Sequence, residues 1–188
     1  MSLTIRLKVV DDQTGKVEID RESHSWTQHI LEFLWLHWWS VWTGANVTDT
    51  GGTPRAIGSY SSTDLDLTIA AGTDTQGIVV GTGVGAESIS SNALGTKTAH
   101  GTGANQLSYG ACSLIEPTIS GSTVTWGAAR TFTNSSTTNP ITVQEIGMYV
   151  IIGSNSYIFC IARDLTGGVA IANGGASKTV TYTFVLTN

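Results

Sequence analysis

The segment of this sequence that comes nearest to a cofactor-binding motif is rich in glycine. It reads Gly81-Thr-Gly83-Val-Gly85-Ala86, a spacing close to that of a dinucleotide-binding loop. That loop works only where a strand runs directly into a helix, whose first N–H groups receive the pyrophosphate. The residues at 87–94, Glu-Ser-Ile-Ser-Ser-Asn-Ala-Leu, are poor helix formers and open no long periodic segment. We therefore interpret 81–86 as a bend in a β protein and expect no cofactor.

Histidines and carboxylates do not form a recognisable catalytic or metal-binding pattern. His29 and His37 are eight residues apart, which places them roughly 80° apart around a helix axis, on different faces. No HExxH sequence or GxSxG elbow is present. Asp11/Asp12 and Asp64/Asp66 are pairs, but aspartate is also what turns require for their backbone geometry. We expect no metal and no enzymatic activity; a calcium site in 44–76 stays open, although no EF-hand spacing occurs there.

Glu145 is the most unusual charged residue of the sequence. It interrupts the otherwise apolar strand-like run Ile141-Thr-Val-Gln-Glu145-Ile-Gly-Met-Tyr149. A carboxylate inside a sheet must be paired or protonated. Arg130 and Arg163 lie in the candidate strands before and after it. We therefore predict a structural ion pair between Glu145 and either Arg130 or Arg163.

Alternating apolar residues predict a mainly β protein, an antiparallel β-sandwich or jelly-roll-like barrel. Residues 3–10 and 16–20 form an expected hairpin around the turn at 11–15, and 44–76 is loop-rich with one candidate strand at 65–69. Further strands are expected near 77–81, 105–116, 122–133, 141–152, 156–163 and 178–187, with a hairpin turn at Gly153-Ser-Asn155. We predict a single domain over 1–188, in which 1–43 is an assembly element and 77–188 forms the sandwich.

One helix is predicted, at about 25–43, and it is rich in tryptophan. Ser25 and Gln28 have the spacing of a capping box, and Gly44 supplies a stop. The expected assembly surface on this helix consists of Leu31, Trp35, Trp38, Trp39 and Trp42. Each tryptophan buries about 150–250 Å² when covered, so the helix needs cover on more than one side. We predict that its own sheet covers one side and a neighbouring subunit the other.

Composition excludes several classes of partner. Charged residues make up 12% of the chain, about half the usual share of roughly 25%. The net charge is −5 and no Lys/Arg cluster occurs, so we expect no nucleic-acid partner. The predicted helix contains Gln28, His29, Glu32 and His37, its apolar runs are short, and its polar face has no Lys or Arg, which argues against membrane contact.

The two cysteines and the N-terminus bear on where the protein is made. Cys112 and Cys160 lie in apolar, strand-like runs outside any CxxC motif; we favour two buried thiols over a disulfide, which stays open. The first residues, Met1-Ser-Leu-Thr-Ile-Arg-Leu-Lys, alternate in polarity. They therefore predict a strand rather than a signal peptide.

A set of motifs over about residues 77–187 resembles structural proteins of tailed bacteriophage virions. The motifs are Ile78-Val-Val-Gly81-Thr-Gly83, Leu94, Gly101-Thr-Gly103, Leu107-Ser-Tyr109, Arg130-Thr-Phe132-Thr-Asn134-Ser-Ser, the run from Ile141 to Tyr149 with Glu145-Ile-Gly147, Ala162-Arg163-Asp164, and the closing Val180-Thr-Tyr182-Thr-Phe184. The helix and its hairpin are not part of this pattern.

This resemblance implies a non-enzymatic protein of the particle, in the capsid, its decoration or the tail. Its partners would be copies of itself and other virion proteins, and it would be made in the host cytoplasm. Closed rings of identical subunits are a common way to build such parts, and would cover the predicted helix surface. The alternative interpretation is a carbohydrate- or receptor-binding β-sandwich module, which requires exposed aromatic side chains on loops or on a flat face.

Overall fold

A computed structural model describes residues 2–23, 25–39, 46–57, 65–152 and 156–188, without the side chains of 34–39 and 46. The described chain is mainly β, as predicted. Its elements are β1 (Ser2–Asp11), β2 (Val17–Glu22), α1 (Gln28–Trp39), β3 (Asn46–Thr48), β4 (Pro54–Ala56), β5 (Gly77–Gly81), β6 (Ser108–Ser120), β7 (Thr123–Asn134), β8 (Ile141–Ile152), β9 (Tyr157–Ile171) and β10 (Ala176–Thr187).

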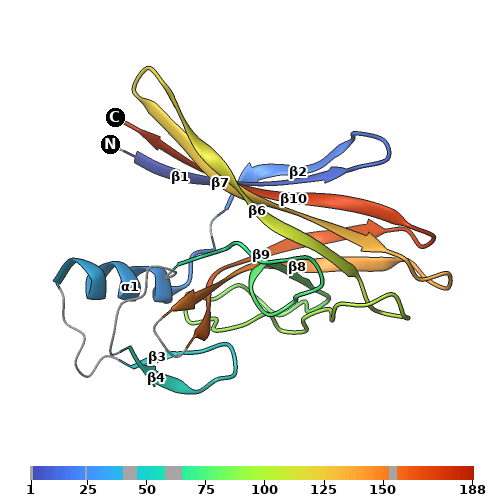
Figure 1. The fold of residues 1–188 in the computed structure, drawn as a ribbon, viewed down its shortest axis with the longest axis horizontal. Helices are drawn as coiled ribbons and strands as arrows, with labels where there is room; N and C mark the ends of the chain where they lie inside the picture. Colours follow the sequence, from blue (N-terminus) through green and yellow to red (C-terminus); the bar gives the residue numbers. More distant parts are fainter. Residues whose placement is uncertain (1, 24, 40–45, 58–64, 153–155) are drawn as a thin grey trace.

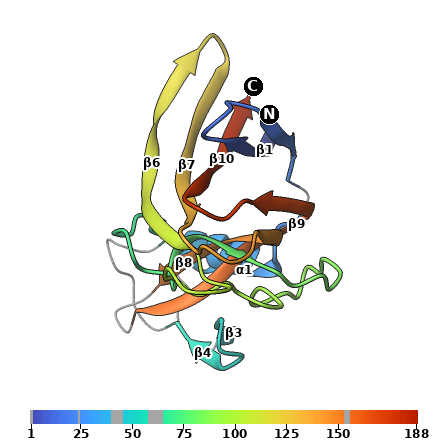
Figure 2. The ribbon, with the colours of Figure 1, turned by 90° about the vertical axis from the view of Figure 1, so that its right-hand side faces the viewer.

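The strands form two main antiparallel sheets that lie over one another as in a sandwich (Figures 1 and 2). The large sheet has the order β2-β1-β10-β7-β6, and the small sheet has the order β5-β8-β9. A separate ribbon pairs β3 with β4. Because β1 pairs with β10 along its whole length, the N-terminal hairpin is part of the large sheet, and the two chain ends lie close together.

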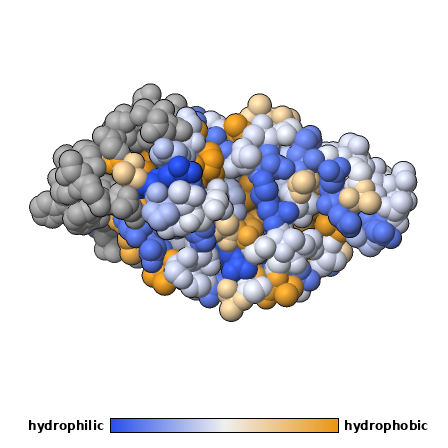
Figure 3. All heavy atoms as spheres, turned by 90° about the horizontal axis from the view of Figure 1, so that it is seen from below, coloured by the Kyte–Doolittle hydropathy of each residue, from blue (hydrophilic) through white to orange (hydrophobic). Residues whose placement is uncertain are grey.

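The core lies between the inner faces of the two sheets. On β1 the buried residues Ile5, Leu7 and Val9 alternate with exposed or half-buried ones, which is the period of a strand with one covered face. The five residues of β5 are all buried, and a short segment around Lys97 pairs with the last residues of this strand along the edge away from β8. The face seen from below is mixed, with hydrophobic residues in small patches between polar ones (Figure 3).

The helix begins three residues later than predicted. Residues 25–27 instead extend the small sheet: Arg163 donates its N–H to the carbonyl of Ser25, and Thr27 donates its N–H to the carbonyl of Ile161. The predicted capping box is wrong, because α1 begins only at Gln28 and the hydroxyl of Ser25 has no hydrogen-bond partner among the described residues. The sheet edge offers this segment more backbone hydrogen bonds than a first helical turn would.

The end of the predicted helix and its tryptophan surface fall largely outside the described residues. Within α1, His29 and Phe33 pack on Phe159 of β9, with ring centroids 6.4 and 5.0 Å from it. Leu31 is 62% exposed. Residues 40–43, including Trp42, and the side chains of Trp35, Trp38 and Trp39 lie outside the described part of the chain, as does the predicted turn at 153–155.

The candidate strand at 65–69 is wrong. This segment makes only isolated bridges, Asp66 to Ile151 and Ile69 to Cys112. Asp66 accepts hydrogen bonds from the N–H and the hydroxyl of Thr68, and Leu65 has a φ of 63°. A left-handed residue followed by an aspartate turn cannot continue a strand.

Strand β9 is longer than predicted. The prediction ended at 163, whereas β9 continues to Ile171 and pairs with the first residues of β8. Gly167 and Gly168 have φ values of 74° and 100°, and the register shifts between Val143 and Glu145. The glycines therefore make a bulge inside the strand instead of ending it.

Candidate functional site

The carboxylate of Glu145 is the centre of a buried polar cluster. Glu145 is 0% exposed, on β8 of the small sheet. Its Oε2 accepts hydrogen bonds from Arg163 Nε at 2.8 Å and from the N–H of Gly95 at 2.9 Å. Its Oε1 accepts from the N–H groups of Thr96 at 2.8 Å and of Gly83 at 3.1 Å. One carboxylate thus joins the sheet to two loops.

Burial acts to raise the pKa of Glu145, but its donors outweigh this effect. The N–H groups of Thr96 and Gly95 and the guanidinium of Arg163 all stabilise the charged form, so the pKa of Glu145 lies below its ordinary value. The Glu145–Arg163 ion pair has both side chains almost fully buried. A carboxylate held charged with its oxygens engaged is suited to fixing the backbone rather than to taking up protons at neutral pH.

Arg163 extends this cluster to the glycine-rich segment. Its Nη1 donates to the carbonyl of Ala86 and its Nη2 to that of Gly85, both at 2.8 Å. A Cβ on Gly81 would lie 2.7 Å from Glu145 Oε1, and one on Gly83 would lie closer still. The glycines therefore allow a close backbone approach to a carboxylate, in agreement with the interpretation of 81–86 as a bend.

Arg130 does not pair with Glu145. It lies on β7 of the large sheet, where its guanidinium donates to four backbone carbonyls: those of Gly110 at 2.8 Å, Gln76 at 2.9 Å, Ile78 at 3.0 Å, and Thr73. Its Cζ also lies 4.8 Å from the centroid of the Tyr109 ring. Burial lowers the pKa of Arg130. No ion pair of Arg130 with a carboxylate occurs among the described residues, so carbonyl oxygens balance this buried cation.

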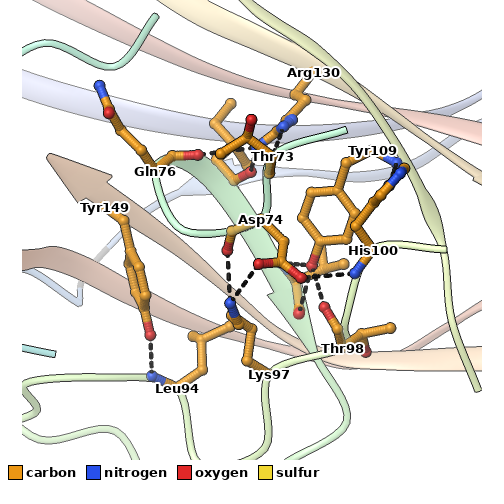
Figure 4. Close-up of polar contacts among 12 residues, drawn as sticks. Thr73, Asp74, Gln76, Leu94, Lys97, Thr98, His100, Tyr109, Arg130 and Tyr149 are labelled. Carbon is orange, nitrogen blue, oxygen red and sulfur yellow. Dashed lines mark hydrogen bonds and ion pairs between the residues drawn. The ribbon is translucent and has the colours of Figure 1, made fainter. Parts of the chain in front are cut away.

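A third set of contacts fixes the loop around Asp74 (Figure 4). Lys97 Nζ donates to the carbonyl oxygen of Asp74 at 2.8 Å and to its Oδ1 at 2.9 Å, and His100 donates its N–H to Oδ2 at 2.7 Å. Tyr109 donates its hydroxyl to the carbonyls of Thr98 and Val80. Burial opposes ionisation of Asp74, but the His100 N–H and Lys97 outweigh it and lower its pKa.

Asp164 is a second buried carboxyl that sequence reasoning missed. It follows Arg163 on β9 and points to the opposite side, between the sheets. Ser23 and Tyr182 donate their hydroxyls to its Oδ2 at 2.7 and 2.8 Å, and Arg21 Nη1 lies 3.6 Å from its Oδ1. Burial raises the pKa of Asp164 above its ordinary value despite these donors. The sequence signal that could have found Asp164 is the alternation of side chains along a strand, which puts the residue after Arg163 on the opposite face of the sheet.

The remaining candidates for chemistry are held by structural contacts. Cys112 and Cys160 are free, buried thiols, and burial raises the pKa of both. His29 is buried and its Nδ1 lies 3.0 Å from the Cys160 carbonyl. In the loop-rich segment Asp49 is engaged by Arg55 and by two backbone N–H groups. No group of three or more His, Cys, Asp or Glu side chains arranged for a metal ion occurs among the described residues.

An open groove of about 560 Å³ lies beside the small sheet. Its polar lining is formed by Thr82, Thr96, Thr142, Asn105, Gln144 and Lys97. Val84, Pro140 and Ile141 supply apolar surface, and none of the described lining residues is aromatic. The volume is in the range of small-molecule sites.

Within the described ranges, no helix has the length and apolar character needed to cross a membrane. Comparison of the chain with known protein families, with curated proteins and with solved structures finds no match.

Proposed function

We propose that this chain is a non-enzymatic structural protein of a tailed-bacteriophage particle, which works by assembling with copies of itself and with other virion proteins. The observation that carries the proposal is that the charged motif residues on which the resemblance to phage proteins rests are engaged in structural contacts. Hydrogen bonds of Glu145 with Gly83 and Arg163 hold loops to the small sheet. Hydrogen bonds of Arg130 hold loops to the large sheet. We therefore interpret the motifs behind the resemblance as ones that maintain the fold of the protein and not a catalytic site.

Such a scaffold suits a subunit that must present a fixed surface. Each of these charged side chains joins a strand to backbone groups far away in the sequence, chiefly in the loops at 73–76, 83–86 and 95–96. Loops tied in this way lose little conformational entropy when a neighbouring subunit covers them. Assembly of rigid copies with closed symmetry is the common result.

The test is the mass in solution, measured by light scattering after size exclusion. We expect the wild-type chain to form a closed oligomer, and Trp38→Glu and Leu31→Glu to dissociate it, since both residues belong to the predicted helix surface. Val84→Glu is the matched control, because Val84 is equally apolar and 74% exposed but lies on the glycine-rich bend. A monomeric wild-type chain at high concentration would contradict the proposal.

The second candidate is a carbohydrate-binding module, and the groove of about 560 Å³ favours it. Its hydroxyl and amide groups could hydrogen-bond a saccharide, whereas its lack of an aromatic lining residue speaks against a stacking platform. A glycan array tests this candidate, with Thr142→Val as the matched variant, because this change removes one exposed hydroxyl and conserves shape. Binding that is weakened by Thr142→Val would move the assignment to this second function.

A further inference from the structure

One end of the large sheet carries an apolar row on its inner face. On β1, the face that buries Ile5 and Leu7 continues to Leu3, which is 56% exposed. Across the sheet Leu3 is opposite Leu186, which is opposite Val124, which is opposite Ile119. Residues opposite one another in antiparallel strands project from the same face. We call this row, together with the rings of Trp126 and Phe184, the end face.

The end face lies where the large sheet extends beyond the small one. Figures 1 and 2 show the hairpin of β6 and β7, with the beginning of β1 and the end of β10, projecting away from β8 and β9. Ile119 is next to the hairpin turn and is 77% exposed. Leu3 and Ile119 are thus exposed at the two ends of one apolar row, and a contiguous exposed apolar patch, unlike a single exposed side chain, is typical of a surface that another molecule covers.

An apolar pocket of about 220 Å³ opens at the base of the end face. The stacked rings of Trp126 and Phe184, with centroids 5.4 Å apart, belong to both the pocket and the end face. Leu114, Trp26 and Ile161 complete much of its lining. An apolar cavity of this size holds water poorly and favours an apolar group. The residues of β7 opposite Leu114 and Ile119 are Ala128 and Val124, four positions apart, so the pocket and the exposed side chain are separated by about 13 Å along the sheet.

We propose that the end face binds the end face of a second copy of this chain about a two-fold axis. Ile119 of each copy enters the apolar pocket of the other. A single face that carries both an exposed side chain and a pocket for it is self-complementary, which is the requirement for a two-fold contact. This inference rests on the proposed function, self-assembly, and names a surface for it that is separate from the predicted helix surface.

Charge and area favour a second copy. Glu116 is the only charged side chain in 2–5, 113–127 and 183–188, so two copies of a chain with net charge −5 meet there with little repulsion. Four strand ends about five residues long span on the order of 300 Å² in projection, which side-chain relief and the pocket increase. This is below the roughly 800 Å² that each partner buries in a standard stable interface. We therefore expect a weak pair that depends on concentration.

The edge of the sheet is a poorer surface for this contact than its face. β6 is the outer strand, but Pro117 lacks an N–H donor, and the register of β6 with β7 shifts twice, between Tyr109 and Cys112 and between Ile115 and Thr118. Proline and bulges in an edge strand prevent another strand from adding to it. A second copy is therefore expected to pack on the side chains of the end face and not to add a strand to β6.

Disulfide trapping tests the contact. The double variant Leu114→Cys/Ile119→Cys is oxidised and analysed on non-reducing gels and by intact mass. Within one chain these two positions are too far apart to bridge, since a disulfide needs Cα atoms within about 7 Å. The native thiols are buried and remain unreactive. We expect a covalent dimer from the double variant, and monomers from each single variant, because the contact joins position 119 of one copy to position 114 of the other.

The outcomes separate this inference from the proposed function. If the wild-type chain is oligomeric by light scattering and the double variant gives no covalent dimer, the end-face contact is wrong and the proposed function stands. If Ile119→Cys alone is linked as efficiently as the double variant, the exchange of Ile119 between pockets is wrong. If the wild-type chain is monomeric and no dimer is trapped, both proposals fail.

A second measurement uses association in place of trapping. In sedimentation experiments over a range of concentrations, Ile119→Asp is expected to weaken self-association by more than about tenfold. Val84→Asp, which changes an equally exposed aliphatic residue away from the end face, is expected to leave it unchanged. Equal effects of the two substitutions would overturn the end-face contact. Because both residues are exposed, neither change is expected to prevent folding.

Discussion

The surroundings of Glu145 and of Asp164 show two ways in which this fold buries a carboxyl group. Glu145 lies under the loops of the small sheet, with one guanidinium and three backbone N–H groups on its oxygens. Asp164 lies between the two sheets, with two hydroxyl donors on one oxygen and Arg21 3.6 Å from the other. Burial opposes the charge at both sites, yet the pKa of Glu145 is lowered and that of Asp164 is raised.

The difference teaches that the number and kind of hydrogen-bond donors decide whether the pKa of a buried carboxyl group is lowered or raised. N–H groups of a fixed backbone and a guanidinium at 2.8 Å compensate the desolvation of Glu145. Two hydroxyls and a half-exposed arginine do not compensate that of Asp164. We infer that Glu145 stabilises the native state in its charged form, whereas the charge on Asp164 opposes folding.

The largest expected effect follows from Glu145→Gln. The amide can keep one oxygen for the N–H groups of Gly83 and Thr96, but its NH₂ group would then face two donors, Gly95 N–H and Arg163 Nε. Breaking a buried pair while leaving its partner charged costs about 3–5 kcal/mol. For a chain of this size that corresponds to a fall in Tm of roughly 10 °C. Urea and thermal unfolding at pH 7 measure both quantities.

The control for this prediction is Glu116→Gln, which makes the same chemical change at an exposed position of β6. It is expected to alter the free energy of unfolding by less than about 0.5 kcal/mol. If Glu145→Gln were as mild as this control, the ion pair with Arg163 would have no structural role.

An intermediate effect is expected from Arg130→Lys. The guanidinium of Arg130 reaches carbonyls of three separate segments, at Thr73, at Gln76 and Ile78, and at Gly110. An ammonium is a single point with three donors and cannot span them, so buried carbonyls lose their partners. We expect a loss of about 2–3 kcal/mol in the free energy of unfolding.

Hydrogen exchange locates the loss from Arg130→Lys. Amides of the loop around residues 73–76 are expected to lose protection, while those near Glu145 keep theirs. A uniform loss of protection over both sheets would contradict the assignment of Arg130 to these loops.

Much of the small sheet could be predicted from the sequence, because its strands alternate regularly or run continuously apolar. Strands β5 and β8 begin and end at the predicted residues. The choice between Arg130 and Arg163 could not be made, because the prediction assumed that strands adjacent in sequence are adjacent in a sheet. The chain instead crosses from the large sheet to the small one between β7 and β8, which takes Arg130 into the other layer.

The hydrogen-bond donors to Glu145 and Asp164 also could not be predicted from the sequence. Gly95 and Thr96 reach Glu145 through a loop, and Ser23 and Tyr182 reach Asp164 from another layer. No local period encodes such contacts between distant segments. The prediction of where α1 begins was wrong for a similar reason, since tertiary pairing of 25–27 with β9 overrides a local capping pattern.

The smallest effect, and the one of opposite sign, is expected from Asp164→Asn. Because burial raises the folded-state pKa of Asp164, the native chain binds a proton here more readily than the unfolded chain does. Its contribution to stability is therefore most favourable below the ordinary aspartate pKa of about 3.9, and it declines as the pH rises through the folded-state value. Asparagine is neutral throughout and can still accept hydrogen bonds from Ser23 and Tyr182.

The informative quantity is the wild-type free energy of unfolding minus that of Asp164→Asn, measured from pH 4 to pH 8. This difference cancels the other carboxylates, including Glu145, whose lowered pKa makes stability fall as the pH drops. We expect the difference to decrease as the pH rises, so that at pH 7 the variant is as stable as the wild type or slightly more stable. A difference that increases with pH would mean that Ser23, Tyr182 and Arg21 stabilise the charged form after all. The two carboxyl sites would then share one mechanism.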